Sequence, residues 1–548
     1  MQSKEFYRKF FGIENPYDIQ ESVWNTMEHG EFPIFIKAPT GSGKTEAVIA
    51  PFLNQFVKDE FNIAPRLIYV LPMRVLVNTV ADRIRNYCNK ISPYISVKVQ
   101  HRDTPDSPFF ISDIVVTTLD QFVYGFSRAS SQLGHHIDIP AGAIASSIVV
   151  FDEAHMYRDE FTFSVMRAIL EILQKTRIPF VIMTATMPES LEKSLFERED
   201  LFKNLKRIIS YEFKGGTVKW KLQDFPLYDG EECNIPTDLL EKIKRKKTLI
   251  VLNQVKRAQK VYRFIKDVLD LENGQIVLLH SRFTKRDRIR YEKKALSIIP
   301  HKKKDKIAIP EGIGIVVSTQ VLEAGIDFSA ELLLTELAPA DSLIQRIGRC
   351  ARYKGQRGEV IIFPLEDDKG WMPYKIEHID NTLKWLKHNP AFDFKNFSQV
   401  LQFVDETLDY HASDYEARDT LIDLYECVLY ADTRPTNIQV REGKPITLVV
   451  VDPSEGEGRG LENRLQTAIN KMDFEGIREA SIEVDFKVGI TLLEKGVIKY
   501  RIDYNPFEKR WKLNRLSETI FSPFGYYLLD INNYRSDLGV EPDGGAFI

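Results

Sequence analysis

The chain has few cysteines, no apolar run long enough to span a membrane, and no excess of positive charge. Its four cysteines are scattered without a C-x-x-C pair, which argues against a disulfide framework and structural zinc and fits a reducing cytoplasm. Residues Met1–Phe6 lack the apolar core of a signal peptide, so we expect a soluble cytoplasmic protein with no membrane partner. The formal net charge of −4 excludes a basic coat, so any nucleic-acid contact must come from a local groove.

Histidine is also dispersed. The ten histidines form no cluster with the ligand spacing of a transition-metal site, and none is followed by Asp. Cutting a phosphodiester by metal catalysis needs carboxylate or imidazole ligands gathered on one or two ions. We therefore expect no metal-dependent nuclease site in this sequence.

Apolar runs alternate with helical patterns in two blocks, which is typical of parallel α/β sheets. A chain of 548 residues, of which 43% are hydrophobic, can build several cores. The strand patterns of the first block are 35–37, 67–71, 114–117, 148–151 and 180–184. Those of the second block are 248–253, 276–280, 313–318, 332–336 and 358–364.

These blocks predict the domain organisation. We expect an α/β chain with a first lobe at 1–210, an interlobe linker region at 211–247, a second lobe at 248–365 and a mixed α/β accessory domain at 366–548. In the accessory domain, 446–452, 481–493 and 497–503 resemble strands.

The segment Ala38–Thr45 (APTGSGKT) follows a strand pattern and opens a helix. Such a turn offers backbone N–H groups to a triphosphate, the ammonium of Lys44 to its β- and γ-oxygens, and the hydroxyl of Thr45 to Mg²⁺. Ala38 stands where the general phosphate-loop pattern has its first glycine, so this motif alone is weak evidence.

Asp152 and Glu153 end a second buried-strand pattern. Asp152 is expected to hold Mg²⁺ together with Thr45, and Glu153 to orient and deprotonate the attacking water. An acidic pair alone also fits a helix N-terminus. The two motifs in this order predict ATP hydrolysis, with Lys44, Asp152 and Glu153 as catalytic residues.

The second block has no phosphate loop, but it contains a cationic motif at 342–352. The spacing predicts Gln345, Arg349 and Arg352 on successive helical turns. If the two lobes close on one another, Arg349 and Arg352 would neutralise charge on the γ-phosphate in the transition state, and Gln345 is the third predicted catalytic residue of this motif. A surface helix with ordinary ion pairs is the alternative.

The chain resembles the superfamily 2 helicases over residues 10–365, because eight motifs occur in the family's order. They are Gln20, Ala38–Thr45, Leu71–Arg74, Thr117–Gln121, Asp152–His155, Thr184–Thr186, Thr319–Asp327 and Gln345–Arg352. The resemblance implies two tandem RecA-like lobes and a site for ATP, with Gln20 reading the adenine edge. The implied ATP-binding residues are Gln20, Thr40, Gly41, Ser42, Gly43, Lys44, Thr45, Glu46, Gly325 and Asp327.

A nucleic-acid path is predicted at residues that directly follow strand patterns, where an open parallel sheet places its functional loops. These residues are Arg74, Thr118, His280, Ser281, Arg282, Thr319 and Gln320. Taken singly, each fits a loop cap equally well. Together they predict phosphate contacts that are sequence-independent and salt-sensitive. The predicted coupling residues are His155, Thr184 and Thr186, with His155 acting through Gln345.

Three strings are similar to the CRISPR-associated helicase of type I systems: Thr118–Gln121, Leu252-Asn253 and Leu279–Arg288. The resemblance implies an ATP- and Mg²⁺-dependent enzyme, recruited by a guide-RNA surveillance complex, that pulls single-stranded DNA with 3′→5′ polarity. A nuclease domain built on a His-Asp pair is common in that family, so we expect a helicase-only form and a separate HD-type nuclease subunit.

Other functions stay open. A DExH-type RNA helicase and a restriction-type duplex DNA translocase share the same ATPase chemistry. A non-catalytic nucleic-acid scaffold is opposed by the intact ATP-site residues.

Overall fold

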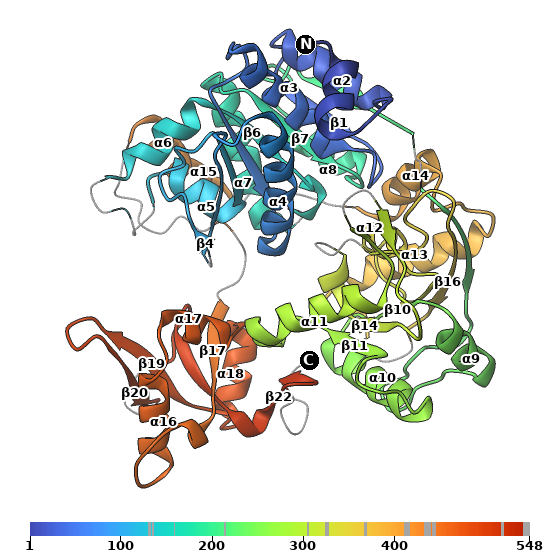
Figure 1. Cartoon of the computed structure of the whole chain (residues 1–548), viewed down its shortest axis with the longest axis vertical. Helices are drawn as coiled ribbons and strands as arrows, with labels where there is room; N and C mark the ends of the chain where they lie inside the picture. Colours follow the sequence, from blue (N-terminus) through green and yellow to red (C-terminus); the bar gives the residue numbers. More distant parts are fainter. Residues whose placement is uncertain are drawn as a thin grey trace. The chain divides into compact units, whose positions relative to one another are not determined.

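Figure 1 shows the computed structural model, which describes all residues except 103, 130–132, 134–135, 158, 213–214, 304–305, 324–327, 366–369, 410–416, 432–439, 441–444, 517–519 and 541–548. The chain divides into two compact units, which are described separately. The first contains residues 1–215, 339–344 and 384–442, and the second contains residues 216–338, 345–383 and 443–548.

The first unit is built on an eight-stranded sheet with the order β4-β3-β5-β2-β6-β7-β1-β8. All neighbouring strands are parallel except β3 and β4. The strands are β1 (Ile34–Lys37), β2 (Arg66–Leu71), β3 (Val97–His101), β4 (Thr104–Pro105), β5 (Ile114–Thr118), β6 (Ser147–Phe151), β7 (Phe180–Thr184) and β8 (Lys206–Ile209). The five strand patterns of the first block are therefore confirmed.

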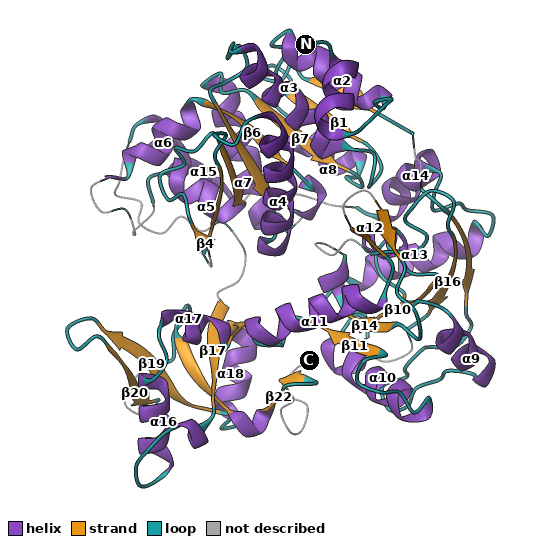
Figure 2. Cartoon of the chain, in the orientation of Figure 1, coloured by secondary structure: helices purple, strands orange, loops and turns teal. Residues whose placement is uncertain are grey.

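Helices cover both faces of this sheet (Figure 2). The side chains of β1 alternate between the two cores, since Ile34 and Ile36 join one and Phe35 joins the other. One face packs against α1 (Ser3–Phe6), the π-helical turn η1 (Tyr7–Phe11), α2 (Asp18–Glu28), α3 (Lys44–Lys58) and α4 (Arg74–Ile91). The other packs against α5 (Leu119–Phe126), α6 (Asp138–Ala145), α7 (Glu160–Lys175) and α8 (Glu189–Leu195).

The second unit contains a six-stranded, fully parallel sheet with the order β11-β14-β10-β15-β16-β9. Its strands are β9 (Thr217–Leu222), β10 (Thr248–Val251), β11 (Ile276–Leu279), β14 (Ile315–Ser318), β15 (Leu332–Glu336) and β16 (Arg357–Phe363). The accompanying helices are α9 (Thr237–Arg245), α10 (Val255–Val268) and α11 (Lys285–Ile298), and a short hairpin pairs β12 (His301–Lys303) with β13 (Lys306–Ala308). Helices α12 (Ala340–Ile347) and α13 (Ile376–His388) are each divided between the two units, after residues 344 and 383. Strand β9 and helix α9 come from the stretch 211–247 that was interpreted as a linker region.

The region after 366 is divided between the two units. Helices α14 (Phe397–Thr407) and α15 (Ala417–Leu429) belong to the first unit, where Leu424 and Cys427 of α15 join the core that contains α7. The second unit contains a mixed five-stranded sheet with the order β18-β17-β21-β19-β20. Its strands are β17 (Pro445–Val451), β18 (Ser481–Asp485), β19 (Ile498–Asn505), β20 (Arg510–Arg515) and β21 (Tyr526–Asp530), and its helices are α16 (Leu461–Asn470), α17 (Phe474–Glu479) and α18 (Phe486–Glu494).

The prediction of a strand over 481–493 is correct only for 481–485. Asp485 caps a helix there, because its carboxylate accepts a hydrogen bond from Lys487 N at 2.8 Å. The chain therefore continues as α18 and not as strand.

The outer edge of β20 is occupied by a side chain. Gln466 of α16 donates from Nε2 to Trp511 O and accepts from Leu513 N, both at 2.8 Å. Its amide thus takes the place of a neighbouring peptide group on this edge strand.

A short hairpin of β22 (Tyr534–Arg535) and β23 (Gly539–Val540) ends the described chain. Among the described helices, none is both long enough and apolar enough to cross a lipid bilayer.

Candidate functional site

The phosphate loop joins β1 to α3 and depends on two glycines in the left-handed region, Gly41 at φ 88° and Gly43 at φ 78°. A Cβ atom on Gly43 would lie 2.4 Å from Gln20 Nε2, so a larger residue would both displace this amide and strain the left-handed backbone. The loop is held against the sheet because Ala38 N donates to Thr184 O at 3.1 Å.

Gln20 lies under this loop and is fully buried. Its Oε1 accepts a hydrogen bond from Tyr17 N at 3.0 Å, and its Nε2 donates to Gly43 O at 3.4 Å. The carboxamide therefore supports the end of the phosphate loop. Its predicted contact with adenine stays a prediction.

The reactive side chains of the loop are folded close to its backbone. Lys44 Nζ donates to Ala38 O at 2.9 Å and to Pro39 O at 3.1 Å. Ser42 Oγ is buried and has no hydrogen-bond partner among the described residues. Thr40 is half-buried, and Gly41 is exposed. The loop thus offers a buried ammonium and a buried hydroxyl to an anionic ligand.

Tyr69 contacts both groups that are predicted to bind Mg²⁺, the carboxylate of Asp152 and the hydroxyl of Thr45. Its hydroxyl donates to Asp152 Oδ2 at 2.6 Å and lies 3.3 Å from Thr45 Oγ1. Burial, followed by the charge of Asp152, raises the pKa of Tyr69, so this hydroxyl remains the donor. Arg83 of α4 also donates to Thr45 Oγ1.

Two side chains of α4 also bind the carboxylate of Glu46. Tyr87 OH donates to Glu46 Oε1 at 3.0 Å, and Arg83 Nε lies 3.6 Å from that oxygen. Tyr69, Arg83 and Tyr87 were not singled out from the sequence. They lie in β2 and α4, where Tyr69 matches an ordinary core position and the other two match ordinary positions on an amphipathic helix.

The carboxylate pair Asp152–Glu153 follows β6. Burial raises the pKa of Asp152 to about 6, and the neighbouring charge of Glu153 adds to this shift, while Lys44 opposes it. Glu153 adopts a left-handed backbone conformation with φ 51°, which is unusual for a residue with a side chain. Its Oε2 is buried and accepts no hydrogen bond from any described residue.

His155 lies between Glu153 and the next strand. Its Nδ1 is 3.5 Å from Glu153 Oε2 and 3.3 Å from Thr184 Oγ1. Thr186 Oγ1 is buried and has no partner among the described residues. His155 and Thr184 therefore belong to one buried polar group beside Glu153. The coupling role of Thr186 and the link to Gln345 stay predictions.

The cationic motif of the second unit does not form successive helical turns. Helix α12 ends at Ile347, and Cys350 forms a bridge to Ala330. Arg349 and Arg352 thus lie in the turn after the helix, where Ala351 has φ 46°. Gln345 and Arg352 are half-buried, and the buried Arg349 donates from Nη2 to Glu323 O at 3.1 Å.

Arg346 is the centre of this region and was missed from the sequence. Its guanidinium is buried and makes five hydrogen bonds, to Glu323 Oε1 (2.9 Å), Thr335 Oγ1 (3.0 Å), Glu336 O (3.1 Å), Asn253 Oδ1 (3.0 Å) and Tyr374 OH (2.8 Å). The available signal was its position on the apolar face of α12 with Leu343 and Ile347, because a cation there must be paired.

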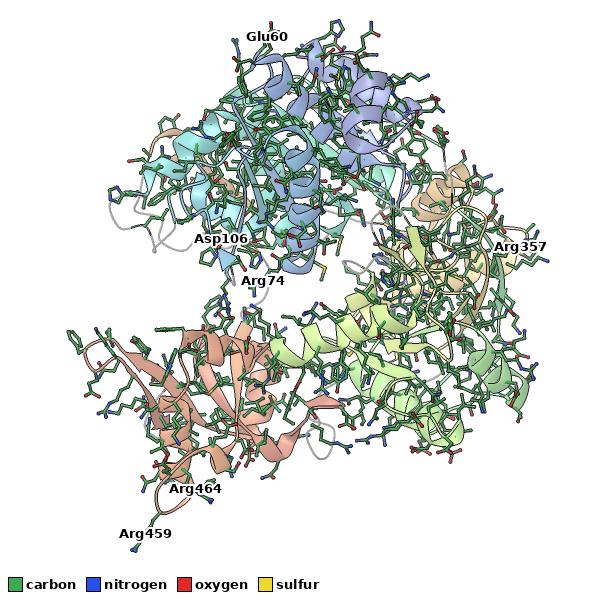
Figure 3. The ribbon with its side chains drawn as sticks, in the orientation of Figure 1. Glu60, Arg74, Asp106, Arg357, Arg459 and Arg464 are labelled. Carbon is green, nitrogen blue, oxygen red and sulfur yellow. The ribbon has the colours of Figure 1, made fainter. Side chains whose placement is uncertain are left out.

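The predicted nucleic-acid contacts differ in exposure. Arg74, which Figure 3 labels, begins α4 and is half-buried. Arg282 and Gln320 are also half-buried, whereas Ser281 is exposed. Gln320 Nε2 donates to Asn253 O at 2.7 Å. Thr118, Thr319 and His280 are buried. Gly325 and Asp327 lie outside the described residues.

His280 is fully buried, so in this conformation it shapes the loop after β11 and does not contact a nucleic-acid strand. Its Nδ1 accepts from Arg282 N at 3.1 Å, and its Nε2 donates to Leu538 O at 3.0 Å. The ring also stacks on Phe283 with 4.3 Å between centroids. Burial, with a contribution from the charge of Arg282, lowers the pKa of His280 to about 3, although the hydrogen bond to Leu538 O opposes this shift.

The C-terminal hairpin fixes this loop from outside. Gln259 Nε2 donates to Leu538 O at 2.6 Å, and Val540 N donates to Arg282 O at 3.0 Å. The hydroxyl of Tyr534 contacts the Asp287 carboxylate and accepts from Thr284 N at 3.2 Å.

Within the described ranges, no group of three or more His, Cys, Asp or Glu side chains has the arrangement of a metal centre.

Two family models match separate stretches of the chain. Residues 17–194 match the DEAD/DEAH box helicase model, and residues 244–355 match the model of the C-terminal part of the CRISPR-associated nuclease/helicase Cas3. The CRISPR-associated helicase Cas3 of Thermoproteus tenax is 28% identical to the chain over 490 residues, which cover 83% of this chain and 79% of that protein.

Solved structures show the same fold. The T. fusca Cas3–AMPPNP crystal structure has a TM-score of 0.71 and 19% identity, and the match covers 96% of this chain and 68% of that one. A chain from a CRISPR RNA-guided surveillance complex, pre-nicking, has a TM-score of 0.60 and 19% identity, with 94% and 67% coverage. These matches confirm the predicted fold of two RecA-like lobes with a C-terminal sheet domain.

Replacing Glu153 by Gln should leave ATP binding nearly intact and lower turnover by about 10² to 10⁴-fold, because the amide keeps the shape but loses the base. ATP affinity and steady-state hydrolysis are measured on the same preparation. Glu189→Gln, which changes an exposed carboxylate paired with Lys193, is the matched control. Near-normal turnover in Glu153→Gln would contradict the assignment.

The protein should lose stability as the pH falls through the window between about 6.5 and 3, because unfolded His280 binds a proton that the folded ring excludes. At pH 5 the loss attributable to His280 is roughly 2 kcal/mol. Denaturant unfolding at pH 7.5 and pH 5 should therefore show a smaller acid-induced loss in His280→Gln than in the unchanged protein. The exposed His29, changed to Gln, is the control; equal losses in all three proteins would refute this account.

Proposed function

We propose that this chain, which is an ATP-hydrolysing CRISPR-associated helicase of superfamily 2, translocates 3′→5′ along single-stranded DNA after recruitment by the guide-RNA surveillance complex of a type I system. The observation that carries the ATPase part is the buried constellation around the phosphate loop. There, Tyr69 joins Asp152 to Thr45, and Glu153 Oε2 accepts no hydrogen bond from a described residue, with His155 Nδ1 3.5 Å away.

The residues around the phosphate loop divide the chemistry among them. The backbone amides of 40–45 and the ammonium of Lys44 bind phosphate oxygens, for which Lys44 exchanges its contacts with Ala38 O and Pro39 O. Glu153 orients the attacking water and takes its proton. His155 holds the Glu153 side chain near Thr184.

Mg²⁺ fits the oxygens of Thr45 and Asp152, since hydroxyl and carboxylate oxygens are the donors that this hard cation prefers. When bound, the ion offsets the negative charge of the phosphates. Tyr69 keeps Asp152 oriented, because its hydroxyl donates to Oδ2 while Glu153 N donates to Oδ1.

Arg349 and Arg352 are proposed to neutralise charge on the γ-phosphate in the transition state, with Gln345 contacting the same group. Arg346 supports them, because its five hydrogen bonds fix the end of α12 to β15 and to Asn253. This arrangement makes Arg346 a positioning residue and leaves Arg349 and Arg352 as candidates for the chemistry.

DNA contacts are proposed for the exposed and half-buried residues Arg74, Ser281, Arg282 and Gln320. Thr118 and Thr319 would contribute through the backbone that their buried side chains hold in place. The proposed DNA contact of the loop after β11 depends on the C-terminal hairpin, which binds this loop through Leu538 and Val540.

A guide-RNA surveillance complex and a separate HD-type nuclease subunit are the proposed partners. Support for the first comes from the structural likeness to a chain of such a complex. Support for the second is the dispersed set of ten histidines in the sequence.

ATP turnover should rise with single-stranded DNA and rise much less with duplex DNA or RNA. The purified chain is assayed without polymer and with each of the three, and DNA is examined in parallel for cutting in Mg²⁺, Mn²⁺, Ni²⁺ or Co²⁺. Lys44→Ala controls for contaminating ATPases and nucleases. Stimulation by RNA alone would favour the RNA helicase, stimulation by duplex alone the duplex translocase, and metal-dependent cutting that maps to this chain would overturn the separate nuclease.

Changing Arg349 to Ala should lower turnover by about 10³-fold or more while changing ATP affinity little, because the charge acts mainly in the transition state. A second variant, Arg349→Lys, keeps the positive charge and tests whether impaired folding contributes to the loss of turnover in Arg349→Ala. The exposed Arg357, which Figure 3 labels, gives the matched Arg→Ala control. A parallel fall in affinity and turnover would make Arg349 a ground-state ligand.

A further inference from the structure

Helix α11 concentrates positive charge in a chain that is acidic overall. Its 14 residues, KRDRIRYEKKALSI, carry six cationic side chains and two carboxylates, whereas the whole chain has a formal net charge of −4. Arg286, Arg290 and Lys293 are exposed and recur at the spacing of one helix face. Lys294 is half-buried beside them.

The two carboxylates of α11 do not neutralise this face. Asp287 is buried and bound by Tyr534 and Thr284, and Glu292 pairs with Arg288 at 3.0 Å. Arg286, Arg290, Lys293 and Lys294 form no ion pair with a carboxylate in the described part of the chain. Like charges one turn apart, at 286, 290 and 294, destabilise an isolated helix by about 0.2–0.5 kcal/mol per pair, so this arrangement does not serve the stability of the helix itself.

Helix α10 extends the same surface. Both α10 and α11 pack against β11 (Figure 1). Lys266 of α10 donates to the neutral amide of Asn273 at 2.8 Å. Burial lowers the pKa of Lys294, and the charges of Arg290 and Lys266 lower it further, which places the three cations within electrostatic range of one another.

Another basic run of the same unit behaves differently. Lys242 and Lys246 of the run 242–247 both bind the carboxylate of Glu359, at 2.9 and 3.0 Å. Lys247 is buried and donates to Gly312 O at 2.7 Å. Three lysines of that run are therefore engaged by a carboxylate or a carbonyl of the same unit, whereas Arg286, Arg290 and Lys293 of α11 are exposed and have no such carboxylate among the described residues.

We propose that Lys266, Arg286, Arg290, Lys293 and Lys294, the α10–α11 basic surface, bind the phosphate backbone of duplex DNA. From 286 to 294 the helix rises about 12 Å, a length over which a duplex carries about seven phosphate charges. Single strands are usually held by aromatic rings that stack on bases. The aromatic ring on α11 itself, Tyr291, is half-buried and donates its hydroxyl to Ser536 O at 2.7 Å, so the surface suits a backbone whose bases are already paired.

This binding is independent of ATP chemistry, because none of the five cations belongs to the phosphate loop, to the acidic pair or to the motif at 345–352. It gives the enzyme a site for duplex in addition to the proposed path for the single strand. The contacts are to phosphates, so the binding is expected to be sequence-independent.

The test is the affinity of the full chain for a fluorescent duplex without nucleotide, measured by anisotropy at several salt concentrations. The variant combines Arg290→Glu, Lys293→Glu and Lys294→Glu. Its affinity should fall by at least 10-fold at 0.1 M salt, and the slope of log K against log salt should shrink by about three. A glutamine version of the same triple should lower the slope similarly with a smaller loss of affinity, and it guards against misfolding caused by charge reversal.

The matched control is Lys9→Glu, Lys98→Glu and Lys203→Glu, which changes the net charge equally at exposed positions of the first unit. ATP turnover without DNA reports whether the proposed ATPase is intact, so a failure of that assignment is distinguished from a failure at this surface. Equal duplex affinity and slope in the test and control triples would overturn the proposal. Fluorescent single-stranded DNA and RNA are measured in the same way, and a loss confined to either of them would overturn the assignment of duplex.

Discussion

The parallel ladder of β6, β7 and β1 is the constraint on which the ATP site depends. It pairs Phe151 with Ile182 and Lys37 with Thr184, so three segments that are distant in the sequence end at one edge of the sheet. Ala38 N then meets Thr184 O, and the residues that follow β6 arrive beside the phosphate loop. A slip of one residue in this register would turn every side chain of the strand to the opposite face, and the loop, the acidic pair and His155 would no longer share one environment.

Features that depend on neighbouring residues were predictable from the sequence. Buried parallel strands appear as apolar runs, and the glycines next to Lys44 indicate a backbone that a triphosphate can approach closely. Tyr69 and Arg83 were not predictable in this way, because an aromatic in a strand and a cation on a helix are ordinary residues until packing places them on Thr45. The same holds for Arg346, whose partners come from four separate segments of the chain.

Long-range pairing also decided where the sequence-based boundaries differ from the structure. Strand β9 lies in a segment with turn-forming residues, but it pairs along its whole length with β16, which joins it to the second sheet. Helix α15 packs on α7 of the first unit although much of the second unit separates them in the sequence. His280 illustrates the same limit at the level of one residue, since its burial depends on a carbonyl at Leu538. A strand-end histidine looks identical from the sequence whether it faces solvent or a later segment of the chain.

The side-chain amide of Gln466 on the edge of β20 has a consequence for how these molecules behave in a crowded cell. An open edge strand invites a strand from another molecule, and such pairing is the first step toward domain swapping and fibrils. Here Trp511 O and Leu513 N already have a partner that belongs to the same chain and carries no further strand. These two backbone groups of β20 are therefore not free to pair with another strand. The β19–β20 hairpin can expose its side chains here without exposing these groups as a template for aggregation.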